Sequence, residues 1–393
     1  MTKETGTPQI RFSGYNDTWE QRKVSELCSI STGKSNTQDK VEDGEYPFYV
    51  RSPIIERSTK YLYDEEAVLT VGDGVGTGKV FHYVNGKYDL HQRCYRMYDF
   101  TDELNAHYFY HTFSKLFYKR VMAMTAKTSV DSVRLEMIAD MEIPCPDIKE
   151  QVQIGAYFDN LDHLITLHQR KYDKLVKVKK SMLEKMFPRE GAKVPEIRFY
   201  GFTDDWEQRK LGEISDLITK GTTPKDKSGT GEVNFIKVEN INPDNGEITN
   251  TSQISMEEHE GYLKRSQLKE NDILFSIAGT LGRVSTVKSS ILPANTNQAL
   301  SIIRLKEGVI EYVTTVLKGK VVEDFIKRNP TVGAQPNLSL EQVNGLEIPF
   351  PNKEEQKEIG DYFRNLDHLI TLHQRKLEKL KNLKKACLKK MFI

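Results

Sequence analysis

The chain of 393 residues is long enough for two domains, and its composition, with 38% hydrophobic residues and a mean hydropathy of −0.56, is that of a water-soluble protein. The 57 basic and 56 acidic residues leave a net charge of +1, which argues against a protein that coats nucleic acid indiscriminately. There is no apolar run of bilayer length, no signal-peptide core at the start and no CxxC pair among the four cysteines, so we expect a cytoplasmic protein with reduced thiols.

The chain begins with a stretch that occurs twice. PQIRFSGYNDTWEQRKVSEL starts at Pro8 and returns as PEIRFYGFTDDWEQRKLGEI from Pro195. Trp19 and Trp206, the two tryptophans of the protein, occupy equivalent points, and we expect each to anchor a core.

A mixed domain is expected after the first copy of this stretch, because short apolar runs alternate with turn signals. Strands are predicted at 67–71 and 79–84, around a glycine-rich turn at 71–78. A mostly helical piece follows at 104–126. The domain closes on EIPCP at 142–146, where two prolines are expected to stop regular structure.

The segment NLDHLITLHQRK, at 160–171, returns unchanged at 365–376, which marks an internal repeat. Around both copies, apolar residues recur at alternating steps of three and four, the spacing of a coiled-coil seam. Long helices are therefore predicted at 149–187 and 353–393. Each seam contains two polar residues that are expected to fix the register, His168 with Lys179 and His373 with Lys384.

The second half repeats the order of the first. Strands are predicted at 233–238, 272–277 and 299–305, a helical stretch at 311–328, and a closing EIPFP at 347–351. The predicted organisation is an N-terminal tag at 1–27, a mixed α/β (α+β) domain at 28–148, a helix at 149–187, a linker with the second tag at 188–214, a second mixed domain at 215–352 and a helix at 353–393.

No catalytic or metal-binding constellation is evident in the sequence. GDGVGTGK at 72–79 resembles a phosphate-binding loop, but Asp73 stands where GxxxxGK needs glycine, and Val80 replaces the Ser or Thr that would hold magnesium. His163 and His168 are five residues apart and would not share a helix face as metal ligands do. We therefore predict no catalytic residue and no metal site.

Polar and basic residues on the turns of the two mixed domains are candidate DNA contacts. Gly78, Lys79 and Val80 are aligned with Gly282, Arg283 and Val284, and His91 and Gln92 with Asn297 and Gln298. Such side chains read base edges and hold phosphates, although they are also the commonest loop residues, so a plain solvated loop remains the alternative. The candidates are Lys34, Lys79, His91, Gln92, Arg93, Lys127, Thr128, Ser129, Lys220, Thr222, Thr223, Arg283, Asn297, Gln298, Gln335 and Asn337.

The charges of the two mixed domains limit this interpretation. Residues 28–142 hold 14 basic and 17 acidic residues, and residues 215–347 hold 15 and 17. Neither domain is basic, so the DNA affinity of the chain alone should be modest, and partners would supply much of the phosphate contact.

The repeated NLDHLITLHQRK helix, the repeated tag containing WEQRK and the two dissimilar domains ending in IPxP resemble the specificity (S) subunits of type I restriction–modification enzymes. The resemblance implies two target-recognition domains joined by two long antiparallel coiled-coil helices in a pseudo-twofold repeat. It implies that each domain reads one part of a split, asymmetric double-stranded DNA sequence.

The same resemblance implies partners that carry the chemistry. Two methyltransferase (M) subunits would dock on the helices to methylate adenine, and restriction (R) subunits would add ATP-dependent cleavage. S-adenosylmethionine, ATP and magnesium would bind to those partners, and none would bind to this chain. The residues expected to form the docking helices are Leu161, Leu164, Ile165, Tyr172, Leu175, Leu366, Leu369, Ile370, Leu377 and Leu380.

Two other classes of function remain open at this point. A stand-alone bipartite DNA-binding regulator would need tight, specific binding by the isolated chain, against which the domain charges argue. A nuclease with an unfamiliar site would cleave DNA without partners.

Overall fold

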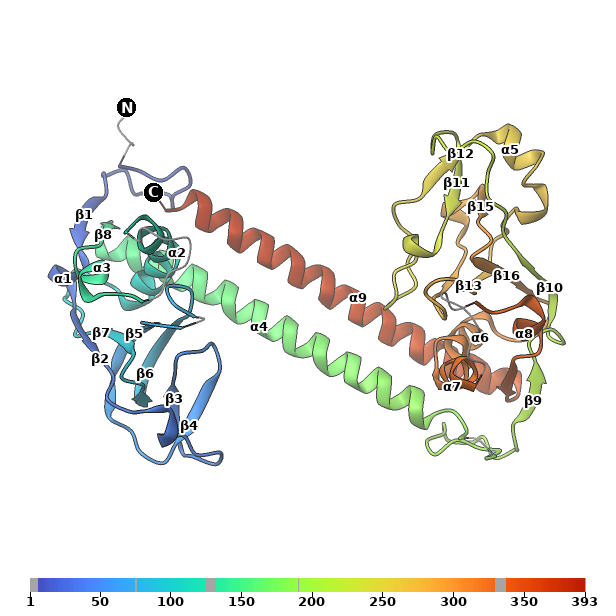
Figure 1. Ribbon diagram of the computed structural model, residues 1–393, viewed down its shortest axis with the longest axis horizontal. Coiled ribbons are helices and arrows are strands. Elements are labelled where there is room, and N and C mark those ends of the chain that lie inside the picture. The colour runs from blue at the N-terminus through green and yellow to red at the C-terminus, as the bar shows by residue number, and fades with distance from the viewer. Residues whose placement is uncertain (1–5, 75, 125–131, 190, 329–336, 393) are drawn as a thin grey trace. The chain divides into compact units, whose positions relative to one another are not determined.

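The structure, a computed structural model, describes residues 6–74, 76–124, 132–189, 191–328 and 337–392 (Figure 1). The chain forms two units. Unit 1 consists of Met1–His168 with Lys376–Ile393, and unit 2 of Gln169–Arg375. Both units mix helices and sheets, as the sequence predicts. No helix in the described part of the chain is long and apolar enough to cross a membrane.

Unit 1 is built on a six-stranded sheet of order β2-β7-β5-β6-β3-β4, in which only β3 and β6 pair in parallel. Its elements, in chain order, are β1 (Glu20–Lys23), α1 (Val24–Leu27), β2 (Ser29–Thr32), β3 (Tyr46–Tyr49), β4 (Ile55–Ser58), β5 (Tyr63–Val71), β6 (Phe81–Leu90), β7 (Cys94–Tyr98), α2 (Ala106–Met124), α3 (Leu135–Ala139), β8 (Glu142–Cys145) and the start of α4 (Ile148–Lys185).

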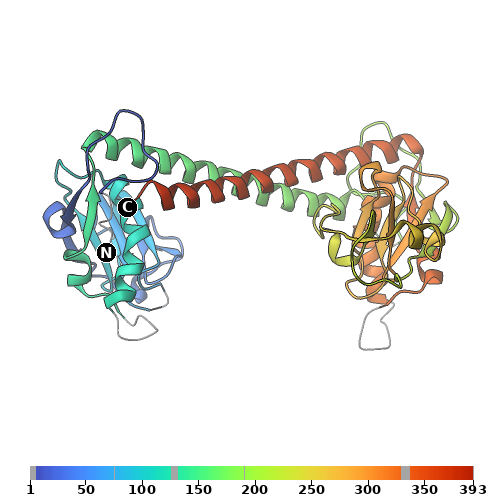
Figure 2. The same cartoon turned by 90° about the horizontal axis from the view of Figure 1, so that it is seen from above.

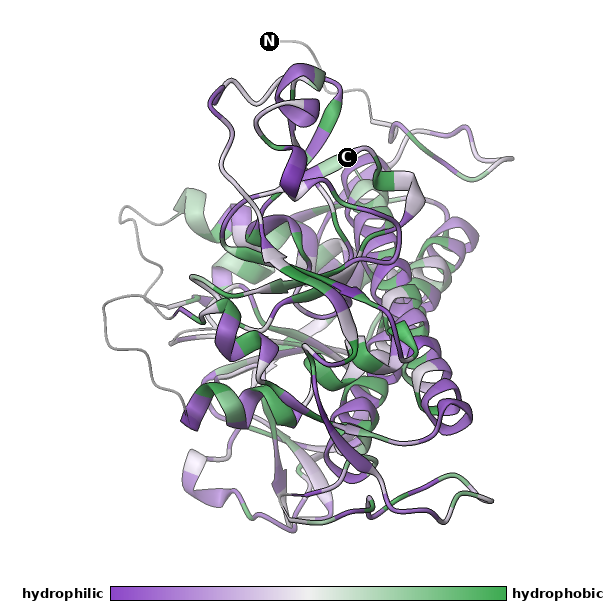
Figure 3. Cartoon of the chain, turned by 90° about the vertical axis from the view of Figure 1, so that its right-hand side faces the viewer, coloured by the Kyte–Doolittle hydropathy of each residue, from purple (hydrophilic) through white to green (hydrophobic). Residues whose placement is uncertain are grey.

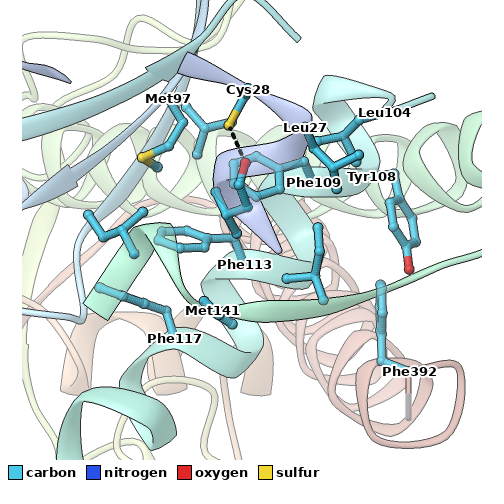
Figure 4. Packing of buried hydrophobic residues seen from close by; sticks show 14 of the residues in the cluster. Leu27, Cys28, Met97, Leu104, Tyr108, Phe109, Phe113, Phe117, Met141 and Phe392 are labelled. Carbon is cyan, nitrogen blue, oxygen red and sulfur yellow. Dashed lines mark hydrogen bonds between the residues drawn. The ribbon is translucent and has the colours of Figure 1, made fainter. Parts of the chain in front are cut away.

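The core of unit 1 lies between this sheet and α2. Phe109, Phe113 and Phe117 recur every fourth residue on α2 and are fully buried, so they form one apolar stripe (Figure 4). Phe81 of β6 packs edge-on against Phe113 at 5.7 Å. The C-terminal Phe392 closes another side of this core, where its ring lies 5.9 Å from that of Tyr108. The sheet, α2 and the chain end therefore share one core.

Unit 2 has related elements, but its strands form a four-stranded sheet of order β10-β16-β13-β14 and a separate three-stranded sheet of order β12-β11-β15. The elements are β9 (Glu207–Lys210), β10 (Ser215–Lys220), β11 (Val233–Ile236), β12 (Ser252–Ile254), α5 (Met256–Glu260), β13 (Ile273–Ser276), β14 (Val284–Thr286), β15 (Ala294–Thr296), β16 (Leu300–Leu305), α6 (Ile310–Leu317), α7 (Lys320–Arg328), α8 (Leu340–Asn344), β17 (Glu347–Phe350) and most of α9 (Lys353–Lys390).

The prediction that prolines stop regular structure at 142–146 is correct only in part, because β8 ends before Pro146 but runs through Pro144. The prolines at 144 and 349 do not stop regular structure, because each lies inside a short strand, β8 or β17, that pairs with the tag strand β1 or β9. A two-stranded sheet leaves one edge of each strand unpaired, so a proline can occupy a position whose N–H is not needed. The helical stretch predicted at 311–328 is confirmed, as the two helices α6 and α7, which are separated at Gly319, a poor helix former.

Both tags are held in the same way. In unit 1 the Ile10 amide donates to the Lys390 carbonyl at 3.0 Å, so the N-terminal tag lies at the end of α9 (Figure 2). In unit 2 the Ile197 amide donates to the Lys185 carbonyl at 2.9 Å. Trp19 and Trp206 are buried with 5% and 4% of their surface exposed, which confirms their expected role as core anchors.

The long helices pack as predicted within each unit. Hydrophobic residues recur between hydrophilic ones along both helices (Figure 3). In unit 1, Lys384 of α9 forms an ion pair with Asp162 of α4 at 2.5 Å. In unit 2, Lys179 of α4 forms the matching pair with Asp367 of α9 at 2.5 Å. The two seam lysines thus pair with the aspartate of the repeated NLDHL segment. Such polar contacts fix the register of the two helices.

Gly155 and Gly360 occupy equivalent positions on α4 and α9, where a neighbouring helix comes close. A Cβ added to Gly155 would lie 3.0 Å from the Tyr108 amide nitrogen, and one added to Gly360 would lie 2.9 Å from that of Tyr312. Replacing a helical glycine with alanine ordinarily stabilises a protein by about 1 kcal/mol.

We expect the opposite for Gly155→Ala and Gly360→Ala, because the added methyl group would push the neighbouring helix away. Each should lower the free energy of unfolding by about 1–2 kcal/mol, measured by urea denaturation. Asn160→Ala, at an exposed position on α4, is the control and should change stability by less than about 0.5 kcal/mol. Stabilisation by Gly155→Ala would contradict the close approach.

Candidate nucleic-acid interface

In unit 1 the loop after β2 lies directly against the turn before β7. The Gly33 amide donates to the Cys94 carbonyl at 3.0 Å, and the Lys34 and Ser35 amides both donate to the Leu90 carbonyl at 3.1 Å. A Cβ on Gly33 would stand only 2.2 Å from the Leu90 carbonyl oxygen. Only glycine permits this contact, which sets exposed Lys34 beside the turn.

Unit 2 contains the same pair of loops. The Gly221 amide donates to the Leu300 carbonyl at 3.2 Å, and the Thr222 amide donates to the Thr296 carbonyl at 2.9 Å. A Cβ on Gly221 would stand 2.0 Å from the Thr296 carbonyl oxygen. The backbone geometry is therefore repeated, whereas the side chains that it presents differ.

A glutamine links the two loops in each unit. The Gln92 Nε2 donates to the Asn36 Oδ1 at 2.5 Å, and the Thr223 hydroxyl donates to the Gln298 Oε1. Gln92 and Gln298 are both exposed, and each amide retains hydrogen-bonding groups that these contacts do not use. A glutamine amide pairs well with the N6 and N7 edge of adenine in the major groove. The alignment of these two turns in the sequence is confirmed.

His91, expected to contact DNA, is only 4% exposed. Its Nδ1 accepts a hydrogen bond from the Arg93 amide at 3.0 Å, and in unit 2 the Asn297 Oδ1 accepts from the Ala299 amide at 3.2 Å. The two residues cap equivalent turns. The prediction of a base contact for His91 is therefore corrected: a buried ring cannot reach a base edge, and it supports the turn that carries Gln92 and Arg93.

Burial lowers the pKa of His91 from its ordinary value of 6.5, so the folded turn favours the neutral ring that accepts this bond. This contribution to stability is complete above pH 6.5 and is lost as the pH falls below that value. If unit 1 reads one half of a DNA site, as the resemblance implies, recognition of that half is expected to weaken up to about tenfold between about pH 7.5 and pH 5.5.

Duplexes altered in one half, titrated across this range, provide the measurement. His91→Asn, which introduces the residue found at this place in unit 2, should flatten the profile for the first half. The second half is the internal control, because Asn297 does not titrate. Equal pH dependence of both halves would count against this role of His91.

Two arginines near the glycine-rich turn extend the candidate surface of unit 1. Arg51 Nη1 lies 3.4 Å from Asp73 Oδ1, and Arg93 Nε lies 3.8 Å from Asp73 Oδ2. The aspartate thus orients two exposed guanidinium groups, which suit phosphate or guanine contacts. Arg51 and Asp73 were not among the candidates from the sequence, because nothing in the sequence brings Arg51 close to Arg93.

Arg265 is the residue that the sequence reasoning missed in unit 2. Its Nη2 donates to the Thr222 hydroxyl at 3.4 Å, so it lies beside the loop pair. Lys220 is exposed at the end of β10, and exposed Asn337 forms an isolated β-bridge with Ala278. The remaining candidates Lys127, Thr128, Ser129 and Gln335 lie outside the described residues.

The alignment of Lys79 with Arg283 is wrong by one position. The Val71 amide donates to the Val80 carbonyl, and the equivalent bond in unit 2 joins Ser276 to Arg283, so Arg283 corresponds to Val80. Its Nη1 donates to the Val238 and Ile241 carbonyls at 3.0 and 2.9 Å.

The guanidinium of Arg283 thus binds backbone carbonyls within unit 2. The prediction that Arg283 contacts DNA is corrected accordingly. Lys79 is exposed, with its Nζ 4.8 Å from the centre of the Tyr118 ring, on α2. It therefore lies over the helix that covers the sheet.

The residues expected to dock partner subunits divide by exposure. Four fill the interiors of the units and offer no surface to a partner, which corrects that expectation: Leu161, Leu366, Ile370 and Leu377. Four are half-buried: Ile165, Tyr172, Leu175 and Leu380. Leu164 and Leu369, at equivalent places in the repeat, are 39% and 40% exposed. Their neighbours Leu167 and Leu372 are exposed as well, although the sequence reasoning did not select them.

Among the described residues, no group of three or more His, Cys, Asp or Glu side chains could hold a metal ion. The polar side chains described on the candidate surface are amides, hydroxyls, lysines and arginines, together with the Asp73 carboxylate that orients Arg51 and Arg93. Such groups can bind phosphates and base edges.

Comparisons with known proteins agree in pointing to one family. A family model described as the type I restriction modification DNA specificity domain matches residues 16–177 and 203–382. The type I restriction enzyme MjaVIII specificity subunit of Methanocaldococcus jannaschii is 22% identical, across 98% of this chain and 94% of its own. The EcoBI specificity subunit of Escherichia coli is also 22% identical, across 96% and 86%.

A solved structure also resembles this chain. The S subunit of a type I restriction–modification system from M. genitalium matches with a TM-score of 0.67 and 17% identity, across 98% of this chain and 99% of its own. At this level of identity the likeness is one of fold.

Proposed function

Because the chain belongs to the family of type I restriction–modification DNA specificity domains, we propose that it reads a split, asymmetric double-stranded DNA sequence, one part with each unit. The observation that carries this proposal is the loop pair that occurs in both units. A glycine fixes the same backbone contact at Gly33 and at Gly221. The loops present Lys34, Gln92 and Arg93 in unit 1.

In unit 2 the same backbone presents Thr222, Thr223 and Gln298. Base edges are distinguished by the donors and acceptors that face them. A constant backbone with different side chains therefore suits two readers of different sequences. Arg51 and Arg93 in unit 1, and Arg265 in unit 2, add cationic groups that hold the duplex.

The chemistry of modification belongs, in this proposal, to other chains of the assembly in the cytoplasm. Two M subunits dock on the repeated helices, and the exposed Leu164 and Leu369, with Leu167 and Leu372, give each an equivalent apolar contact. M subunits bind S-adenosylmethionine and methylate adenine. R subunits add cleavage driven by ATP and magnesium. The helices set the spacing between the two parts of the site.

The slight acidic excess of both mixed domains agrees with this division, because the partner subunits would supply much of the phosphate contact. The chain itself is then a non-catalytic subunit that selects the DNA.

Replacing residues 28–147 with the corresponding domain of a relative tests the proposal. The assembled methyltransferase is expected to change one half of the methylated sequence and leave the other half intact, because the two loop pairs lie in different units. Methylation-aware sequencing of DNA from cells carrying the chimera gives the answer. A change in both halves, or in neither, would rule out modular reading, and cleavage by the purified chain alone would assign the chemistry to it.

A further inference from the structure

Unit 1 has a basic groove whose row of lysines is not repeated at the equivalent place in unit 2. The groove lies between α2 and the last turns of α9, encloses about 400 Å³, and is lined by Lys115, Ile165, Lys381, Lys384, Lys385, Leu388 and Lys389. Ile165 and Leu388 provide an apolar floor, and the aliphatic stems of the lysines widen it. From Lys376 to Lys390, α9 carries seven lysines and a single acidic residue, Glu378.

Two of the lysines that line the groove already have partners within unit 1. Lys384 forms the ion pair with Asp162, and the Lys115 ammonium donates to the Leu388 carbonyl. Lys381, Lys385 and Lys389 are exposed, and none of the three has an ion-pair partner within the described ranges. They are spaced by four residues, so their ammonium groups line one side of α9 at steps of about 6 Å.

The repeat provides an internal comparison for this groove. Lys384 and Lys179 are equivalent, because each pairs with the aspartate of the NLDHL segment. On the same register Val176 stands where Lys381 does, and Glu184 stands where Lys389 does. Lys115 is matched by Gly319, where an added Cβ would lie 3.9 Å from the Cδ2 atom of Leu183, the counterpart of Leu388. The apolar floor is retained in unit 2, but the lysine row is not.

We propose that this groove is a docking site for an acidic amphipathic helix of a partner protein, present once in each chain. A helix with glutamates four residues apart repeats its charges at about 6 Å, which matches the lysine row. Its apolar ridge covers Ile165 and Leu388.

A DNA strand fits this surface less well, because its sugar–phosphate backbone offers no apolar ridge for the floor. The site is distinct from the exposed leucines of the repeat, which occur in both units. Unit 1 would therefore bind a partner that unit 2 does not bind.

The test uses the full-length chain and a fluorescein-labelled peptide of about 20 residues, long enough to form a helix. The peptide has leucines along one face and glutamates four residues apart beside them. Fluorescence anisotropy is expected to show saturable binding with one peptide per chain. A peptide in which glutamine replaces each glutamate should bind on the order of tenfold more weakly, because the charge pairing is lost.

Variants that exchange the residues of the two units locate the site. Lys381→Val with Lys389→Glu installs the residues of unit 2 and is expected to weaken binding at least tenfold. Val176→Lys with Glu184→Lys makes the reciprocal change and should raise the number of peptides bound per chain to two. Lys379→Val with Lys376→Glu changes the charge equally on surface that does not line the groove, so binding should stay near that of the natural chain. Circular dichroism verifies that each variant folds.

Several results would overturn the proposal. They are equal binding by the exchanged and control variants, two peptides bound by the natural chain, or displacement of the peptide by a short duplex of unrelated sequence. The last would assign the groove to nucleic acid. The sequence of methylated DNA reports the proposed reading function separately, and it should be unchanged in the exchanged variants.

Discussion

Gly33→Ala is expected to weaken recognition of one half of the DNA site roughly a hundredfold and leave the other half intact, and Gly221→Ala is expected to do the reverse. The added Cβ would stand 2.2 Å from the Leu90 carbonyl oxygen in the first case and 2.0 Å from the Thr296 carbonyl oxygen in the second. Backbone on both sides of these contacts cannot move aside as a flexible side chain could.

The two loops must therefore separate, and in unit 1 the bond between Gln92 and Asn36 is lost with them. Loss of oriented base contacts worth about 3 kcal/mol corresponds to roughly a hundredfold weaker binding. Electrophoretic mobility shifts of the assembled methyltransferase, with duplexes altered in either half, provide the measurement.

Gly6→Ala is the matched control for both substitutions. A Cβ there would meet no atom closer than 3.7 Å, an ordinary van der Waals contact. It is expected to leave both halves recognised. If Gly33→Ala weakened both halves equally, the loop pair of unit 1 would not be a reader of one half.

Glu355→Ala is expected to produce the largest loss of stability, about 3–5 kcal/mol in the free energy of unfolding. The carboxylate is fully buried and forms two hydrogen bonds with Arg198, at 2.7 and 2.8 Å. It also accepts from the Trp206 Nε1 at 3.1 Å. Removing the carboxylate leaves the largely buried Arg198 guanidinium with only the Asp204 carbonyl, at 2.8 Å, and leaves the buried indole N–H without a partner, and both losses are costly.

Glu150→Ala is the natural comparison in unit 1. Glu150 is also fully buried and binds Arg11 at 2.7 and 2.8 Å. The Trp19 Nε1 has no hydrogen-bond partner among the described residues. Glu150→Ala should therefore cost about 1 kcal/mol less than Glu355→Ala, because no indole hydrogen bond is lost.

The two tryptophans permit separate measurement of the two units. Urea denaturation followed by fluorescence in a Trp19→Phe background reports on unit 2, and in a Trp206→Phe background on unit 1. Glu355→Gln, which preserves the shape of the side chain, should lower the free energy of unfolding less than Glu355→Ala does. Equal effects of the two alanine substitutions would show that the indole bond contributes nothing.

The internal repeat made the frame of this protein predictable. A segment repeated without change, in a three-and-four pattern, predicts the same helix twice, and α4 and α9 span Ile148–Lys185 and Lys353–Lys390. The pattern also identified Lys179 and Lys384 as polar seam residues. It could not name Asp367 and Asp162 as their partners, because periodicity along one helix does not give the pairing with another.

In the candidate interface, equivalent residues of the two units can be matched from the sequence only where a loop directly precedes a recognisable strand. The turn holding Gln92 was matched correctly to that holding Gln298, because both immediately precede a strong strand. Arg283 was misplaced by one position, since the two glycine-rich turns differ in length and only the hydrogen bonds between strands fix the alignment. Burial of His91 was also not evident, because a single histidine in a turn gives no periodic signal.

The composition of unit 1 has a consequence for how the protein is made. Unit 2 is continuous in sequence, whereas unit 1 needs residues from both ends of the chain, and Cys387, Met391 and Phe392 belong to its core. During translation, domains fold as their residues leave the ribosome. The nascent chain can complete unit 2 first, and the N-terminal part of unit 1 must wait until residues 376–392 have been synthesised. Truncation of the chain before residue 376 would therefore damage the first reader and spare the second.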